Sequence, residues 1–132
     1  PGLGMQMCQL ITGEERKEGQ TEERIGSETR TALFELSKEE TAKLVIAYEP
    51  IWAIGSGQAA TPKDAEEIAS FIRKTVKEAA GKKAADEVRI LYGGSVNGDN
   101  ISHFMKQKNI DGALIGGASL KPDTMIDIYN KA

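Results

Sequence analysis

The regular alternation of apolar runs and helical patterns restricts the fold of this chain more than any other feature. Short apolar runs occur at 5–11, 44–48, 88–92 and 113–115, and after each run apolar residues recur at helical spacing. The run at 44–48 is almost continuously apolar, as in a strand that is buried on both faces of a parallel sheet. The order is strand–helix repeated four times, which predicts an α/β fold with a parallel sheet and right-handed crossovers.

The sequence also carries start and stop signals for its helices. Thr61 and Pro62 predict a helix start, with threonine as the N-cap and proline at the first helical position. Gly81 is placed to end that helix. Ser37 opens a Ser-Lys-Glu-Glu segment of capping-box form. Further helices are expected in a short stretch before Gly19, from Thr21, around Phe104 and from Pro122.

Four strand–helix units are too few to close an eight-stranded barrel. The chain is therefore expected to be either half of a (β/α)8 TIM barrel or a small open α/β sheet. No linker rich in proline, glycine or serine divides it, so residues 1–132 are expected to form a single domain. The chain begins with Pro1 and not with methionine, from which we expect a fragment or an incomplete gene.

The composition excludes several classes of function. The net charge of −3 and the pI of about 5.3 argue against a nucleic-acid binder, which normally has a basic face. Cys8 is the single cysteine, so we expect a buried structural thiol and a reducing, cytoplasmic location. No apolar run is long enough to span a membrane, and no signal peptide is recognisable at the start. Neither clustered metal ligands nor a dinucleotide fingerprint is found, so no metal or cofactor is expected.

Three of the four predicted strands end in a segment suited to binding a ligand, since ligands of parallel α/β folds lie at the carboxyl ends of the strands. Gly93-Gly94-Ser95 follows the third strand and Gly116-Gly117 follows the fourth. Glycine pairs at helix starts expose backbone N–H groups, and two such loops side by side could hold one phosphate. The alternative is that these glycines only form tight turns.

The loop after the second strand is long and is expected to expose Ile51, Trp52 and Ile54, which a simple connector would avoid. Pro50 and the glycines at 55 and 57 resemble the stiff and hinged ends of a lid. Glu49 comes at the end of the strand, where a general base would lie. The alternative is a surface glutamate followed by an apolar loop that packs on a neighbour.

These segments resemble motifs of the triosephosphate isomerase family. The segment at 47–57, Ala-Tyr-Glu-Pro-Ile-Trp-Ala-Ile-Gly-Ser-Gly, is similar to the family signature and is highly specific. The segments at 92–96 and 114–120 resemble two more family motifs, in the same order and at the same spacing. The resemblance runs from about Gly13 to Tyr129 and covers what would be units five to eight of the barrel.

The resemblance implies the C-terminal half of a TIM barrel and the interconversion of glyceraldehyde 3-phosphate and dihydroxyacetone phosphate, a step of glycolysis and gluconeogenesis. Glu49 would be the base that moves a proton between the two carbons of an enediolate. A mobile lid would run from Pro50 to Gln58. Its residues would be Pro50, Ile51, Trp52, Ala53, Ile54, Gly55, Ser56 and Gly57, with Gln58 at the end.

By the same resemblance, backbone N–H groups of Gly55, Ser95 and Gly117, with Gly116 adjacent, would bind the substrate phosphate. Tyr92 and Ser95 would hold the lid closed by hydrogen bonds. Closing the lid would exclude water and so protect the enediolate from losing its phosphate.

The family also needs a neutral histidine and a lysine from the N-terminal half of the barrel, and this chain does not contain that half. The only histidine, His103, falls in a predicted helix and is expected at or near the surface. Without the electrophile, the isolated chain is expected to be nearly inactive. The expected partners are a triose phosphate and either the missing half or a second copy of the chain, because a half-barrel exposes two edge strands and an apolar face.

Two other interpretations stay open from the sequence. The chain could be a non-catalytic half-barrel that binds phosphate ligands or self-assembles, or part of another phosphate-binding barrel such as a sugar-phosphate epimerase, which lacks the lid. The chain departs from the family pattern at three places. The segment Gln9-Leu10-Ile11 replaces an apolar-Gly-Glu segment, Ser56 replaces threonine and Gln58 replaces lysine.

Overall fold

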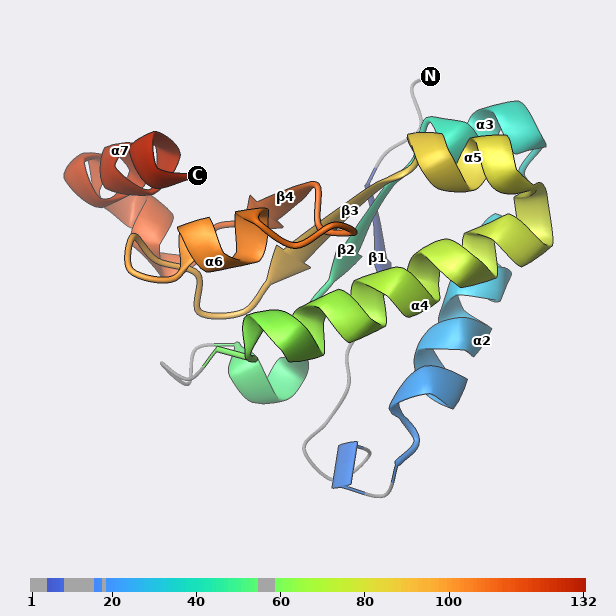
Figure 1. The fold of residues 1–132 in the computed structure, drawn as a ribbon, viewed down its shortest axis with the longest axis horizontal. Coiled ribbons are helices and arrows are strands. Elements are labelled where there is room, and N and C mark those ends of the chain that lie inside the picture. The colour runs from blue at the N-terminus through green and yellow to red at the C-terminus, as the bar shows by residue number, and fades with distance from the viewer. Residues whose placement is uncertain (1–4, 9–15, 18, 55–58) are drawn as a thin grey trace.

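The computed structural model of the chain describes residues 5–8, 16–17, 19–54 and 59–132. Its centre is a four-stranded sheet in which neighbouring strands run parallel and follow one another in chain order (Figure 1). The strands are β1 (Met5–Cys8), β2 (Val45–Tyr48), β3 (Arg89–Gly93) and β4 (Gly112–Leu114). The predicted α/β class with parallel strands is confirmed.

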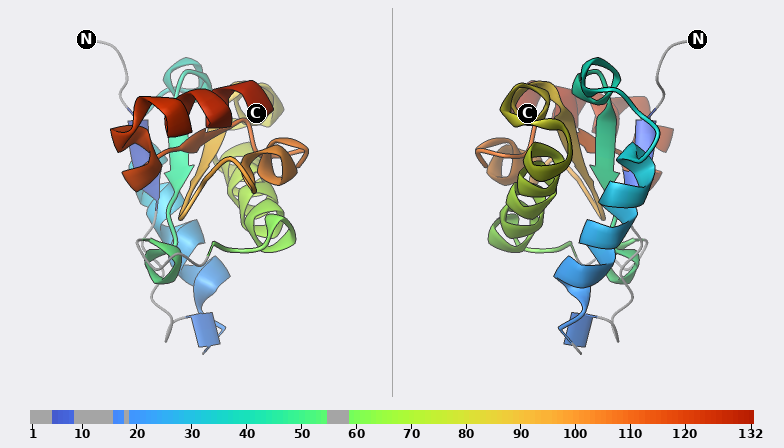
Figure 2. Two further views of the ribbon diagram at one scale, coloured as in Figure 1. Left: turned by 90° about the vertical axis from the view of Figure 1, so that its left-hand side faces the viewer. Right: turned by 90° about the vertical axis from the view of Figure 1, so that its right-hand side faces the viewer.

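Helices connect each strand to the next. The α-helices are α2 (Thr21–Leu33), α3 (Lys38–Ala42), α4 (Pro62–Ala80), α5 (Lys82–Glu87), α6 (Ile101–Met105) and α7 (Pro122–Lys131). Two 3-10 turns, η1 (Ile51–Ala53) and η2 (Gly117–Leu120), follow β2 and β4. Helices α2 and α4 pack against each other along the sheet, while α7 lies at the opposite end of the molecule against η2 and α6 (Figures 1 and 2).

One face of the sheet forms the core with the helices. Ile46 pairs in register with Ile90, and Tyr48 with Tyr92, and all four side chains are buried. They belong to one apolar cluster, which also contains Ile72 and Val76 of α4 and Phe104 of α6. On the alternate positions of β3 the side chains are less covered, and Arg89 is exposed. The sheet is therefore packed with helices on one face and covered less on the other.

The predicted helix signals are confirmed in detail. The hydroxyl of Thr61 accepts a hydrogen bond from the backbone N–H of Asp64 at 3.1 Å. Gly81 ends α4 with a φ of 93°, a conformation that favours glycine. Ser37 and Glu40 form both hydrogen bonds of a capping box. Local polar groups thus define where these helices begin and end.

The structure differs from the sequence-based expectations mainly at element ends. Helix α5 was not expected, because its six residues are too few to show an apolar period. The predicted first strand is observed as Met5–Cys8, and the rest of that prediction, 9–11, lies outside the described residues. The short helix expected before Gly19 is represented by helical residues 16–17. In α7, Ile128 is buried but Tyr129 is 79% exposed, so much of the apolar surface of this helix has no cover.

Candidate functional site

A cavity of about 470 Å³ lies at the carboxyl ends of β2, β3 and β4. Its wall is formed by Glu49 after β2, by the glycine loop after β3 and by the glycine loop after β4. The structure thus brings Glu49, Ser95, Gly116 and Gly117 together on one cavity, as the sequence predicted from the fold class. Gly55, the remaining predicted phosphate-binding residue, lies outside the described residues.

Glu49 is placed by the end of β2 and by a glycine beside it. A Cβ atom at Gly93 would lie 3.1 Å from both Cγ and Oε1 of Glu49, so the side chain of the glutamate rests against the backbone of β3. Any larger residue at position 93 would have to displace the glutamate. In the described part of the chain the Glu49 carboxylate forms no hydrogen bond, which leaves it available to a ligand in the cavity.

Ser95 holds its loop in a tight conformation beside this cavity. Its φ of 54° lies in the left-handed region, which a serine adopts only at a cost. The Ser95 hydroxyl donates a 2.7 Å hydrogen bond to the carbonyl of Ala53, and the Asn100 side-chain amide donates to the Ser95 carbonyl at 3.0 Å. These bonds connect the loop after β3 both to η1 and to the start of α6.

Tyr92 connects the same loop to the segment that precedes α4. The Ala60 backbone N–H donates to the Tyr92 hydroxyl at 2.9 Å, and the hydroxyl donates to the Gly94 carbonyl at 3.0 Å. The ring of Tyr92 is stacked on Phe104, with centroids 4.4 Å apart. Burial raises the pKa of Tyr92, so at neutral pH the phenol keeps the proton that it donates. A Cβ atom at Gly94 would lie only 2.7 Å from this hydroxyl, so the contact requires glycine.

The first part of the predicted lid is described, and the remainder, 55–58, is not. Ile51 and Ile54 are 42% and 48% exposed, as expected, but the expected exposure of Trp52 is wrong, because its ring packs against the core. Trp52 is half-buried, and the guanidinium of Arg16 lies over its ring at 4.3 Å from the centroid. The sequence did not reveal Arg16, because no local pattern marks a contact between residues so far apart in the chain.

The loop after β4 differs from the loop after β3, because its glycines are not required by close packing. A Cβ atom at Gly116 or Gly117 would meet nothing within 4 Å. The backbone turns here into η2, where the N–H and the hydroxyl of Ser119 both donate to the Gly116 carbonyl at 2.9 and 2.6 Å. The open space beside these two residues belongs to the cavity.

Other candidate residues lie away from this cavity. His103 is exposed on α6, as expected, and neither it nor any lysine is among the residues that line the cavity. Among the described residues no group of three histidine, cysteine, aspartate or glutamate side chains is arranged to hold a metal ion. Within the same residues, no helix combines the length and the apolar character needed to cross a bilayer.

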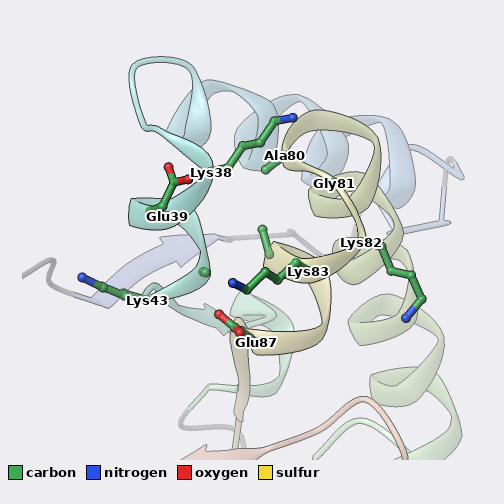
Figure 3. A pocket seen from close by; sticks show the side chains of 10 residues that line it. Lys38, Glu39, Lys43, Ala80, Gly81, Lys82, Lys83 and Glu87 are labelled. Carbon is green, nitrogen blue, oxygen red and sulfur yellow. The ribbon is translucent and has the colours of Figure 1, made fainter.

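A second cavity, of about 480 Å³, lies between α3 and α5, before the starts of β2 and β3. Figure 3 shows that its lysine side chains do not converge, since Lys43 and Lys82 point to opposite sides. Lys82 is paired with Asp86 at 2.8 Å. This cavity therefore has no arrangement of charge that would select a ligand.

Comparisons with known proteins show the family to which the chain is similar. The family model described as triosephosphate isomerase matches residues 2–132. The triosephosphate isomerase of Caldanaerobacter subterraneus subsp. tengcongensis is 53% identical over 116 residues, which are 88% of this chain and 47% of that protein. That of Ligilactobacillus salivarius is 50% identical over 129 residues, 98% of this chain and 51% of that protein.

The triosephosphate isomerase of Dictyoglomus turgidum is 51% identical over 115 residues, which cover 87% of this chain and 46% of that protein. The chain thus spans about half the length of the curated relatives that it matches. Since the family model extends over nearly every residue, the chain belongs to the triosephosphate isomerase family.

Proposed function

We propose that this chain is the C-terminal half of a triosephosphate isomerase barrel, units five to eight, and that its single domain supplies the base and the phosphate loops of the active site. The observation that carries the proposal is that Glu49 and both glycine loops line one cavity. The parallel strand order β1-β2-β3-β4 supports a half-barrel, because a barrel of this type is a single sheet of neighbouring parallel strands.

In the proposed reaction Glu49 removes a proton from one carbon of the triose phosphate and returns it to the neighbouring carbon. Glyceraldehyde 3-phosphate and dihydroxyacetone phosphate are thereby interconverted through an enediolate. The position of Glu49 favours this role, since this residue follows a strand, lines the cavity and forms no side-chain hydrogen bond to the described part of the chain. In the family this reaction serves glycolysis and gluconeogenesis in the cytoplasm, and we propose the same for the protein to which this chain belongs.

The phosphate group of the substrate would bind between the two glycine loops. Backbone N–H groups of Ser95 and Gly117, with Gly116 beside them and Gly55 from the lid, would donate hydrogen bonds to it. Tyr92 and Ser95 would hold the lid in place. Their bonds support this role, because Ser95 is bonded to Ala53 within the lid and Tyr92 to Ala60 just after it.

The isolated chain should be nearly inactive. No histidine or lysine lines the cavity among the described residues, so nothing would polarise the substrate carbonyl or stabilise the charge of the enediolate. The missing groups would come from a separate N-terminal half, whereas a second copy of this chain would cover the apolar surface without supplying them. Exposed apolar residues of η2 and α7, Leu120, Ile126 and Tyr129, support such a partner at the β4 end of the sheet.

A coupled isomerase assay tests the proposal. The 132-residue chain is assayed with glyceraldehyde 3-phosphate alone and after addition of a separately produced N-terminal half of a relative. We expect no turnover alone and turnover after mixing, with loss of that turnover in Glu49→Gln. Turnover by the chain alone that Glu49→Gln abolishes would show that copies of the chain build a working site, and would contradict the proposed inactivity.

A second candidate function is a half-barrel that binds phosphate ligands without catalysis. The open space beside Gly116 and Gly117 favours it, because two glycines that line the cavity leave room for a ligand against their backbone. Titration of the chain with a triose-phosphate analogue separates the two candidates. Binding with no turnover in any mixture supports the binding module, whereas restored turnover supports the isomerase.

A further inference from the structure

Arg16 contacts both ends of the segment that joins β2 to α4. On one side its guanidinium lies over the ring of Trp52, 4.3 Å from the centroid. On the other side its Nη2 donates to Oδ2 of Asp64 at 3.1 Å. Trp52 belongs to η1, three residues after Glu49, and Asp64 lies in the first turn of α4. One side chain from the loop after β1 therefore joins the beginning of this segment to the helix that follows it.

Each contact has a physical basis beyond proximity. A guanidinium above an indole ring is attracted by the negative face of the ring, and it can stack on the ring while it donates hydrogen bonds at its edge. Asp64 is itself fixed, because its backbone N–H donates to the Thr61 hydroxyl at 3.1 Å and its negative charge lies at the N-terminus of α4. The partner of Arg16 is thus carried by a backbone position that the helix cap holds in place.

The indole of Trp52 depends on this contact. Its Nε1 is buried, and no acceptor is found for it among the described residues. A buried N–H without a partner gives the ring no polar contact that would hold it in place. The stacked guanidinium is then the polar group that acts on this ring, together with the apolar packing of Trp52 against the core.

We propose that Arg16 is a positioning residue for η1 and, through it, for Glu49. The guanidinium links Trp52 to the first turn of α4. The turn that follows Glu49 therefore keeps its position when substrate enters the cavity. Within this turn the backbone N–H of Ala53 donates to the Pro50 carbonyl at 2.9 Å. This bond connects η1 to Pro50, the residue next to Glu49. The catalytic consequence rests on the proposed function, but the constraint on Trp52 does not.

Trp52 fluorescence measures the constraint directly, because it is the only tryptophan in the sequence. We expect Arg16→Met to increase acrylamide quenching of Trp52 about two- to fivefold, the factor by which loss of one exposed cation–π contact shifts a local equilibrium. Arg16→Lys should recover part of the protection. Arg24→Met is the matched control, since it removes an exposed arginine that pairs with Glu28 at 2.7 Å on α2.

Quenching that is unchanged in Arg16→Met, or that rises equally in Arg24→Met, would overturn the proposal. If circular dichroism shows that Arg16→Met does not fold, Asp64→Asn decides in its place. This variant keeps the arginine and replaces its charged partner by a neutral amide, so quenching above that of the unmodified chain supports the constraint and no rise contradicts it.

The second readout is kinetic and uses the chain mixed with the N-terminal half of a relative. A residue that positions Glu49 should lower kcat severalfold in Arg16→Met and leave KM nearly unchanged, whereas a merely structural defect would lower the amount of active enzyme without changing the kcat of that fraction. Titration of active sites separates these cases, and an unchanged kcat per site contradicts the role toward Glu49. If the unmodified mixture has no activity, the proposed function fails while the fluorescence result still decides the constraint.

Discussion

The two ends of the sheet use their polar groups in opposite ways. At the amino end, charged side chains and backbone groups form hydrogen bonds and ion pairs that connect strands and helices. At the carboxyl end, the carboxylate of Glu49 and the loops around it leave polar atoms facing a cavity. In barrels of parallel strands the amino end contributes mainly to stability and the carboxyl end carries the chemistry. The difference between the ends of this half-sized chain follows the same division.

The amino end is organised around Arg73 of α4. Its Nη1 donates to the carbonyls of Ala85 and Val88 at 2.6 and 3.1 Å, and its Nη2 pairs with Asp111 at 2.7 Å. Asp111 also accepts the backbone N–H of Ile90 at 2.8 Å. One guanidinium therefore joins α4, the end of α5 and the residues at the starts of β3 and β4. Such an arrangement stabilises the fold and leaves little for a ligand to bind.

The carboxyl end instead combines a strained backbone with an unsatisfied polar group and exposed apolar residues. Ser95 has a positive φ, and the indole N–H of Trp52 is buried without an acceptor in the described chain. Ile51 and Ile54 are exposed beside the cavity. Strain and unsatisfied groups of this kind destabilise a fold, and they persist where binding or catalysis needs them. Substitutions at each end of the sheet test this difference.

The largest effect is expected for Glu49→Gln in the mixture of this chain with an N-terminal half. Loss of a general base lowers kcat by about 10²- to 10⁴-fold. The matched control is Glu87→Gln, a glutamate that lines the cavity at the amino end and should leave kcat unchanged. Steady-state kinetics with glyceraldehyde 3-phosphate measure both. Equal losses in the two variants would remove the functional distinction between the ends.

The next effect is one of stability, at the amino end. Arg73→Met should lower the free energy of unfolding by about 2–3 kcal/mol, because it leaves several acceptors without their charged donor. Urea denaturation followed by circular dichroism measures the change. Lys82→Met is the control, since it breaks an exposed pair with Asp86 and should have no measurable effect. If both variants are equally stable, the Arg73 bonds do not hold this end together.

A smaller loss of stability is expected for Tyr92→Phe at the carboxyl end. The substitution leaves the buried backbone N–H of Ala60 without an acceptor, which costs about 1–2 kcal/mol. Tyr129→Phe removes a hydroxyl from an exposed ring and should leave the urea midpoint where it is. In the active mixture, Tyr92→Phe should also lower kcat if this bond holds the lid, and a normal kcat would limit Tyr92 to a structural role.

The smallest effect is expected for Ser37→Ala, at the start of α3. The variant removes one of the two capping-box bonds, the 3.1 Å bond from the Glu40 backbone N–H, and should lower the free energy of unfolding by about 1 kcal/mol. Ser27→Ala, an exposed serine inside α2, should be neutral or slightly stabilising. A loss in Ser37→Ala no larger than in Ser27→Ala would mean that the cap contributes little to this end.

The sequence predicted those parts of the fold that depend on neighbours in the chain. The N-cap at Thr61, the C-cap at Gly81 and the capping box at Ser37 were predicted from residue types within one helical turn. The strand–helix order followed from the period of apolar residues. Helix α5 was not predicted, because its six residues include too few apolar positions to show a helical period.

For the candidate site, the sequence identified the residues and the fold class placed them together. Glu49, Ser95, Gly116 and Gly117 were expected to meet because the carboxyl ends of parallel strands share one edge of the sheet. The sequence could not distinguish glycines that packing requires from those that it does not. Gly93 and Gly94 are of the first kind, whereas Gly116 and Gly117 are of the second.

By itself, then, the sequence determined the family, the order of the strands, the caps of several helices and the residues that could carry chemistry. Only the tertiary structure decided which distant side chains act together. Arg16 meets Asp64 across 48 positions of the chain, Arg73 meets Asp111 across 38, and Tyr92 meets Ala60 across 32. The physical reason is range: caps and periodicity act within a few residues along the backbone, whereas these contacts exist only once packing of the helices on the sheet brings their partners within hydrogen-bond distance.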